Sequence, residues 1–364
     1  MIIPNMAYLV LYSLTLISLF LYSFTLVDLN LTFFNHPFWE LFREKVIYIG
    51  WFRRDLSWIL YLVLILLLFL FNWFFTNRYK KFNPMIIALL VSIALLMSYP
   101  FLSHDFFNYL FDARILTFYH KSPYLFTALD FPADAWTRFM HWTHRTYPYG
   151  PTFLIISLIP SFLAGSKFIL NYFSFKLMFF LFYFLAVYAL NKLNKKWAIF
   201  FATHPLVIVE GLINSHNDLI GVCLSILGGY FILKNQNLKG RAIFLFSAGI
   251  KYITAPFVFL SKNNKSINTI IFALACLVLV YLKITSAFHA WYALSLLVFI
   301  PFFPNLISKL NIFFIGLLMS YYPYIRIGEW SSQIEDTIIF WFLIINVIYL
   351  AVPVIWSRIK LTRR

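Results

Sequence analysis

The polar segment at residues 103–124 carries the side chains best suited to chemistry in an otherwise apolar chain. Asp105, Tyr109 and Asp112 follow one another at intervals of four and three residues, which places them near one face of a helix. A carboxylate in such a position can accept the proton of an attacking hydroxyl group. Simpler roles are also open, because Asp105 can cap a surface helix and the two aspartates can hold a divalent cation.

Polar residues gather in three other places. Residues 214–218 read Asn-Ser-His-Asn-Asp, residues 288–292 read Phe-His-Ala-Trp-Tyr, and Lys251 stands alone in an apolar run. Polar side chains in a membrane chain are costly, so each place is a functional hypothesis. Each also has a structural interpretation: a turn that starts a helix, an aromatic belt, or a lysine that snorkels to the interface.

Composition assigns the chain to the membrane. The 364 residues are 62% hydrophobic and 12% charged, whereas soluble domains carry about 25% charged residues. Repeated apolar runs predict an all-α, polytopic integral membrane bundle of about 10–12 transmembrane helices. The net charge of +16 comes from short clusters of lysine and arginine between these runs, as in cytoplasmic loops. We therefore expect the lipid bilayer as a partner, and no nucleic acid.

The positive-inside rule orders the first runs across the membrane. The basic link at residues 78–81 predicts that residues 28–54 and 103–150 lie outside the cytoplasm, the former as an interfacial amphipathic stretch. The spans expected from this pattern are 6–27, 57–76, 84–100, 197–212, 219–234, 269–284, 293–304, 311–327 and 338–356. Both termini are then cytoplasmic, in a multi-pass protein of the cell membrane.

The middle of the chain allows two topologies. In the preferred one, residues 151–192 cross once, and residues 242–260 form a re-entrant hairpin broken near Lys251 and Pro256. Residues 214–218 then lie outside, on the same face as the loop after residue 103. A twelve-span alternative places them inside and violates the charge rule twice.

Several of these residues resemble, in order, the motifs of polyprenol-phosphate-mannose-dependent mannosyltransferases, which are bacterial members of the GT-C glycosyltransferase superfamily. Three of these motifs resemble the first outer loop of that family, namely Ser103-x-Asp105-x-x-x-Tyr109, Arg114-Ile115 and Pro123-Tyr124. The later matches are Tyr149-Gly150-Pro151, His216-Asn217-Asp218, Gly249-x-Lys251 with Pro256, and His289-x-Trp291-Tyr292. The resemblance covers roughly residues 100–300. It departs at Asp112-Ala113, where a neutral pair is usual, and at Ala290, where a proline is usual.

The resemblance implies one GT-C domain over residues 1–364. Its extracytoplasmic catalytic loop, with short amphipathic helices, would be residues 101–150, and its outer active-site segments residues 213–218 and 285–292. The implied reaction transfers a sugar, which the resemblance implies is mannose, from a polyprenyl-phosphate donor to a hydroxyl of a glycan or glycolipid acceptor, with inversion. No metal or cofactor is required by this scheme, because the donor carries one phosphate; a divalent metal at Asp105 and Asp112 stays open.

The resemblance also implies roles for individual residues. Asp105 is the implied general base. The cations implied to hold the donor phosphate are Arg114, Arg145, His289 and Lys251. The implied acceptor or sugar contacts are Tyr109, Tyr149, His216, Asn217, Asp218, Trp291 and Tyr292.

Three rival classes fit parts of the pattern. A transporter or flippase for lipid-linked saccharides would place polar residues near mid-membrane and show repeated halves. A lipid-linked glycan ligase would use outer arginine and histidine residues with a diphosphate donor. A non-catalytic scaffold predicts that Asp105→Asn leaves function intact. The concentration of polar residues in one outer loop favours an enzyme.

Overall fold

The computed structural model describes residues 3–362, except for residues 30, 32, 34, 286 and 287, and this part of the chain is helical without strands. The elements of the first half are α1 (Ile3–Ser23), η1 (Phe24–Leu26), α2 (Pro37–Ile47), η2 (Tyr48–Phe52), α3 (Arg54–Asn77), η3 (Tyr79–Lys81), α4 (Pro84–Leu95), α5 (Asp105–Thr117), η4 (Ala128–Asp130), η5 (Ala135–Phe139), α6 (Pro151–Ala164) and α7 (Phe168–Leu193). The label η marks short 3-10 or π-helical elements.

The second half continues the same pattern with shorter helices. Its elements are α8 (Lys195–Ala202), η6 (Val207–Ile213), α9 (Asp218–Leu233), α10 (Asn237–Ala248), η7 (Tyr252–Phe259), α11 (Lys265–Thr285), η8 (Ala290–Phe299), α12 (Pro304–Ile307), α13 (Asn311–Met319), η9 (Pro323–Ile327) and α14 (Ser332–Thr362). Residues 286–287 of the expected outer segment 285–292 lie outside the described residues.

Five of the described helices are long and apolar enough to cross a membrane. They comprise Met6–Leu26, Arg54–Asn77, Phe168–Leu193, Lys265–Thr285 and Ser332–Val352. A sixth span is possible if α8 and η6, which meet at an angle of 64°, count as one broken crossing. The expectation of a polytopic, all-helical membrane protein is confirmed, with fewer long helices than the roughly 10–12 expected, since several runs form helices shorter than 18 residues.

Proline explains where three expected spans are broken. The expected span 84–100 ends as a helix at Leu95, ahead of Pro100, and the run 197–212 breaks between α8 and η6 ahead of Pro205. The run 311–327 breaks between α13 and η9, which begins at Pro323. Proline lacks an amide hydrogen and restricts the residue before it, so a helix ends or restarts there.

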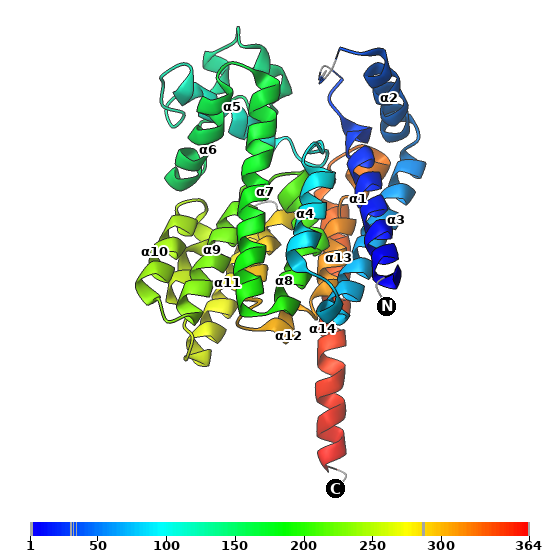
Figure 1. Cartoon of the computed structure of the whole chain (residues 1–364), viewed down its shortest axis with the longest axis vertical. Coiled ribbons are helices and arrows are strands. Elements are labelled where there is room, and N and C mark those ends of the chain that lie inside the picture. Colours follow the sequence, from blue (N-terminus) through cyan, green and yellow to red (C-terminus); the bar gives the residue numbers. More distant parts are fainter. Residues whose placement is uncertain (1–2, 30, 32, 34, 286–287, 363–364) are drawn as a thin grey trace.

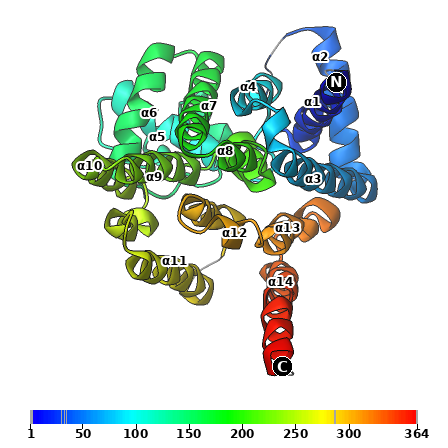
Figure 2. The same ribbon diagram turned by 60° about the horizontal axis from the view of Figure 1, so that its bottom comes forward.

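The helices have two distinct ends. Figure 1 shows α2, α5 and α6 at the upper end, while the C-terminal part of α14 extends beyond the rest of the bundle at the lower end. Figure 2 shows α11, α12, α13 and α14 on one side of α8, α9 and α10, with α14 outermost. The polar loop that follows α4 is therefore carried at one end of the bundle.

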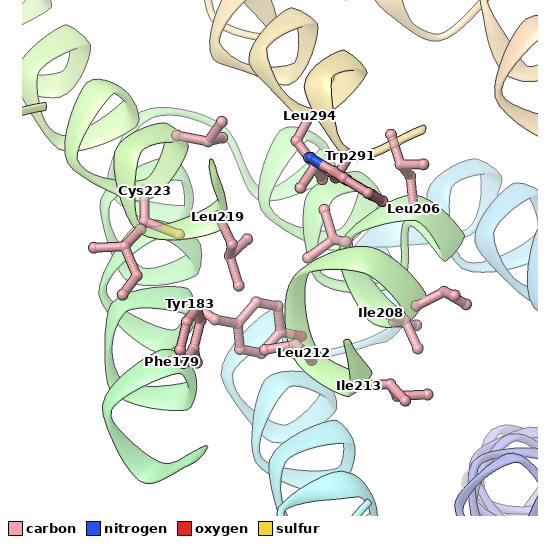
Figure 3. Packing of buried hydrophobic residues seen from close by; sticks show 14 of the residues in the cluster. Phe179, Tyr183, Leu206, Ile208, Leu212, Ile213, Leu219, Cys223, Trp291 and Leu294 are labelled. Atoms are coloured by element: carbon pink, nitrogen blue, oxygen red, sulfur yellow. The ribbon is translucent and has the colours of Figure 1, made fainter. Parts of the chain in front are cut away.

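The buried core lies around α7, α8, α9, η6 and η8, which pack against one another. Figure 3 shows Trp291 of η8 among the buried side chains of this region, near Leu206 and Leu294. Lys176 of α7 is fully buried, and its Nζ donates to the carbonyl oxygens of Leu212 and Ile213 at 3.1 and 2.5 Å. These bonds satisfy carbonyl groups at the end of η6 and hold the following residues 214–218 in place.

Candidate active site

The backbones of two motifs, Tyr149-Gly150-Pro151 and Gly249-x-Lys251, approach each other closely next to the candidate site. The amide of Gly150 donates to the carbonyl of Ile250 at 3.2 Å, and the amide of Thr152 donates to the carbonyl of Gly249 at 3.0 Å. A Cβ atom on Gly150 would collide with the Gly249 carbonyl. The close approach joins the end of the polar loop to the turn between α10 and η7. It brings the segment of Tyr149 next to that of Lys251.

We expect Gly150→Ala to destabilise the protein, because its methyl group would push these two backbones apart. Overpacking of this kind costs about 1–3 kcal/mol, so the Tm measured in detergent should fall and transfer activity should fall with it. Gly229→Ala is the matched control, because its Cβ would meet only Phe302 at ordinary contact distance. Equal Tm values for the two variants would contradict the close approach.

Asp105 begins α5 at the centre of a polar cluster. Its Oδ1 lies 3.7 Å from Nη2 of Arg145, and its Oδ2 lies 3.7 Å from Nδ1 of His216. The nearby Trp142 side chain favours the ionised form of Asp105 and so lowers its pKa. Its side chain is 14% exposed, so the carboxylate is enclosed but still reachable. Burial raises the pKa of Asp105, and the positive charges of Arg145 and Lys251 oppose this rise.

His216 extends the cluster into the core. Its Nε2 lies 3.6 Å from Oε2 of Glu210, and the side chains of both residues are fully buried. Its ring stacks with that of Trp291, with centroids 3.8 Å apart. Trp291 also stacks with His289, at 4.2 Å. Burial lowers the pKa of His289 to about 4, and the nearby Lys251 acts in the same direction, so this imidazole is neutral at neutral pH.

Lys251 contacts both α9 and η8. Its Nζ lies 2.5 Å from Oδ2 of Asp218 and 4.7 Å from the centre of the Tyr292 ring. Lys251 therefore has an anionic partner, and its side chain is still 23% exposed.

Asn217 and two tyrosines pack beside this cluster. The backbone amide of Asn217 donates to the Tyr109 hydroxyl at 3.4 Å. The Tyr109 ring lies edge-on to that of Tyr149, with centroids 5.2 Å apart. Asn217 is fully buried, and neither polar atom of its side chain has a protein partner among the described residues. Buried amides are normally hydrogen-bonded, which makes Asn217 a suitable ligand for a hydroxyl group.

Arg114 lies apart from this cluster. It is nine residues after Asp105, about 14 Å along the helix, and its Nε donates to Oδ2 of Asp134 at 2.6 Å. Its guanidinium also lies over the rings of Phe118 and Trp136, 4.0 and 4.1 Å from their centroids. The sequence-based role of Arg114 as a donor-phosphate contact therefore lacks geometric support, because Asp134 and two aromatic rings already surround the charge.

Two further groups in α5 and its loop have no assigned role in the sequence pattern. His104 stacks on His141 with centroids 3.6 Å apart, and burial, with His141 beside it, lowers the pKa of His104 to about 3. Burial raises the pKa of Asp112 to about 8, although Arg145 opposes the rise. Asp112 is thus largely protonated at neutral pH when no cation is bound. Among the described residues, no group of three or more His, Cys, Asp or Glu side chains could hold a metal ion.

Glu210 is the site residue that sequence reasoning missed. It is fully buried in η6, and its Oε2 accepts a hydrogen bond from Asn214 Nδ2 at 3.2 Å. Asn214 is itself held by the amide of Leu102, which donates to its Oδ1 at 3.2 Å. The available signal was a single acidic residue inside an apolar run, which is costly in lipid and therefore functional by default.

We expect Glu210→Gln to lower kcat about tenfold or more while leaving KM for the donor nearly unchanged. The Glu210 carboxyl lies 3.6 Å from Nε2 of His216, so its replacement should alter the orientation of this ring beside Asp105, and a tenfold loss corresponds to about 1.4 kcal/mol. Steady-state kinetics with both substrates varied would separate the effect on kcat from the effect on KM. A rise in KM at constant kcat would contradict the orienting role.

We expect Arg145→Gln to move the acid limb of the pH–rate profile to higher pH. The positive charge of Arg145 lowers the pKa of Asp105 against the effect of burial, so its removal raises that pKa further. The ionised form of Asp105 then disappears at a higher pH as the solution is acidified. Arg138→Gln is the matched control. Arg138 lies in the same loop but donates a hydrogen bond to the carbonyl of Ala135, so its replacement should leave the pH of the acid limb unchanged.

The described spans and the enclosed polar cluster at one end define a multi-pass helical membrane protein with a candidate active site. A sequence model of the family described as alpha-(1->6)-mannopyranosyltransferase, N-terminal domain, matches residues 30–262. This match covers more than half of the chain, so the chain belongs to this family and is a membrane mannosyltransferase of GT-C type. Comparisons with curated proteins and with solved structures gave no match.

The family match contains most of the cluster. It includes Asp105, Arg145, His216 and Lys251, whereas the segment with His289, Trp291 and Tyr292 lies beyond residue 262. The identification as an enzyme sets aside the transporter and scaffold interpretations.

Proposed function

We propose that the protein transfers mannose from a polyprenyl-phosphate donor to a hydroxyl of a glycan or glycolipid acceptor, on the extracytoplasmic face of the cell membrane. The observation that carries the proposal is the position of Asp105, enclosed at the bundle end between Arg145 and His216. The family name describes an alpha-linked product. An inverting transfer that makes an alpha linkage requires a beta-linked donor.

Asp105 is the proposed general base. The acceptor oxygen attacks the anomeric carbon and forms the new C–O bond while its proton passes to the carboxylate. The bond between the anomeric carbon and the phosphate oxygen breaks, and its electron pair remains on the lipid phosphate. Burial favours this role, because it raises the pKa of Asp105 and strengthens the carboxylate as a proton acceptor.

Arg145 and Lys251 are the proposed ligands of the donor phosphate. Both cations act electrostatically on Asp105, so they lie close to where the reaction would occur, and both side chains are partly exposed. Preorganised positive charge stabilises the negative charge that develops on the leaving phosphate. His289, which is neutral, would contribute a hydrogen bond, and Asn217 with Tyr109 and Tyr149 would contact the acceptor or sugar. This set needs no metal ion.

The distribution of charge supports the proposed orientation. Basic residues lie at or just beyond the ends of α3, α7, α9 and η7, at Arg78, Lys80, Lys81, Lys192, Lys195, Lys196, Lys234, Lys239, Lys262 and Lys265. No aspartate or glutamate occurs in residues 56–104, 165–209 or 219–328. Hydrogen bonds connect these turns, from Lys195 Nζ to the Lys80 carbonyl and from Lys262 Nζ to Asn235 Oδ1. The positive-inside rule makes this basic end cytoplasmic and the Asp105 end extracytoplasmic.

A labelling experiment tests the orientation. Single cysteines replace Asp130 in the loop and Lys239 at the basic end, both of which are exposed, in a variant with Cys223 and Cys276 replaced by serine. We expect a membrane-impermeant maleimide to label position 130 in intact cells and position 239 only after permeabilisation. The reverse pattern would refute an extracytoplasmic site.

A second experiment tests the stereochemistry. Mannosyl transfer from a synthetic beta-linked prenyl-phosphate mannose is followed by NMR of the product. We expect an alpha linkage, in agreement with inversion. A beta-linked product would contradict direct attack with Asp105 as base.

A further inference from the structure

A shallow groove lies between α1 and α3, on the part of the bundle that faces lipid. Its volume is about 500 Å³. It is lined by Tyr8, Leu14 and Ser18 of α1 and by Leu64, Phe71 and Phe74 of α3. Both helices are long and apolar enough to cross the membrane. The groove therefore opens toward lipid and not toward the candidate active site.

The length of the groove matches one leaflet. Tyr8 contacts Phe74 at one end, with ring centroids 4.3 Å apart, and the lining ends at Ser18 and Leu64. Ten residues of helix separate the two ends on each side, which is about 15 Å. This is half of the hydrocarbon core, which is about 30 Å thick. A partner transmembrane helix would need a complementary face along the full thickness, whereas one lipid chain needs half of it.

Positive charge lies at one end of the groove, next to Tyr8 and Phe74. The Arg78 guanidinium lies 4.6 Å from the centre of the Phe74 ring and 5.8 Å from that of Tyr8. Arg78 is exposed, and no described carboxylate forms an ion pair with it. Lys80 and Lys81 follow in η3, and Lys195 Nζ donates to the Lys80 carbonyl. No described carboxylate forms an ion pair with these lysines, and residues 56–104 contain no acidic side chain.

We propose that this groove binds an anionic phospholipid of the leaflet on the basic side. One acyl chain lies along α1 and α3, and the phosphate group is held by Arg78 with support from the lysines of η3 and α8. An arginine fork suits phosphate oxygens, and anionic lipids are attracted by basic clusters next to a membrane span. The site is independent of mannosyl transfer and stands if the proposed reaction is wrong.

The test uses the full-length protein in detergent, titrated with phosphatidylglycerol or with phosphatidylcholine of the same acyl chains. Native mass spectrometry counts bound lipid, and thermal unfolding measures stabilisation. We expect phosphatidylglycerol to bind about tenfold more tightly than phosphatidylcholine. Arg78→Gln should weaken its binding about fivefold, and Leu14→Trp should abolish it by filling the groove. Leu14 is 53% exposed, so this variant is expected to fold.

Lys239→Gln is the matched control, because Lys239 is an exposed basic residue at the same end but belongs to α10 and does not line the groove. It should bind phosphatidylglycerol like the wild type. Equal binding of the two lipids, or equal loss in the Lys239 and Arg78 variants, would overturn the proposal. A dimer in phosphatidylglycerol nanodiscs that Leu14→Trp disrupts would also overturn it, because the groove would then hold a second copy of the chain.

Discussion

Replacement of Asp105 by asparagine is expected to reduce mannosyl transfer by a factor of about 10² to 10⁴, the usual contribution of a positioned general base. Asparagine keeps the shape of the side chain and its contacts with Arg145 and His216, but it cannot take the acceptor proton. The binding of the donor should change little, so the loss should appear in kcat. Single-turnover rates with the donor in excess would measure this loss without the contribution of product release.

Asp130→Asn is the matched control for that variant. Asp130 lies in the same loop and is exposed, and its carboxylate accepts hydrogen bonds only from the amide and hydroxyl of Thr127 among the contacts of the described residues. Its replacement should leave kcat close to the wild-type value. Full activity of Asp105→Asn would remove Asp105 from the mechanism, and Asp218 would be the next carboxylate to test.

The second large effect is expected from the buried pair of Arg114 and Asp134, whose side chains are 8% and 3% exposed. Removal of one member of a buried ion pair costs about 3–5 kcal/mol, because the other charge stays buried without its partner. Arg114→Gln and Asp134→Asn should therefore both lower the Tm strongly and by similar amounts. The double variant should cost less than the sum of the two, as a double-mutant cycle would show.

The same pair predicts a dependence of stability on pH. Burial alone would raise the pKa of Asp134, but hydrogen bonds from the Trp136 amide, Arg114 and Tyr119 outweigh it and hold the pKa below its ordinary value. Its contribution is present above the unfolded pKa of about 3.9. It is lost as the pH falls through the lower folded value. If Arg114 instead served the donor phosphate, Arg114→Gln would impair donor binding and Asp134→Asn would not.

The long spans were predictable from the sequence, and their interruptions were less so. The expected spans 6–27, 57–76 and 269–284 lie close to α1, α3 and α11, because long apolar runs flanked by charges have few alternatives to a helix in lipid. The residues 242–260, expected as a re-entrant hairpin broken near Lys251 and Pro256, form the end of α10 and η7, which pack together about a turn at Lys251, and Pro256 lies inside η7. The runs broken ahead of Pro100, Pro205 and Pro323 were expected as continuous helices, because hydropathy alone does not register a local proline effect.

The proximity of the candidate residues was predictable where motif order was informative. Asp105, His216 and Lys251 were named from motif order and Arg145 from its charge in the same loop, and the structure places these four candidate residues close together. The pairing of Arg114 with Asp134 depends on how the loop folds back on α5, and no spacing rule predicts it. The contact of Glu210 with His216 depends on η6, a π-helical turn that hydropathy does not distinguish from an ordinary span.

The most direct test of the proposed reaction is the initial rate of mannosyl transfer by the purified wild-type protein in proteoliposomes, with labelled prenyl-phosphate mannose as the only mannose source. The proposed reaction predicts labelled product at a rate proportional to enzyme, in the presence of a metal chelator. Product formed from a nucleotide-linked mannose and not from the prenyl-phosphate donor would contradict it.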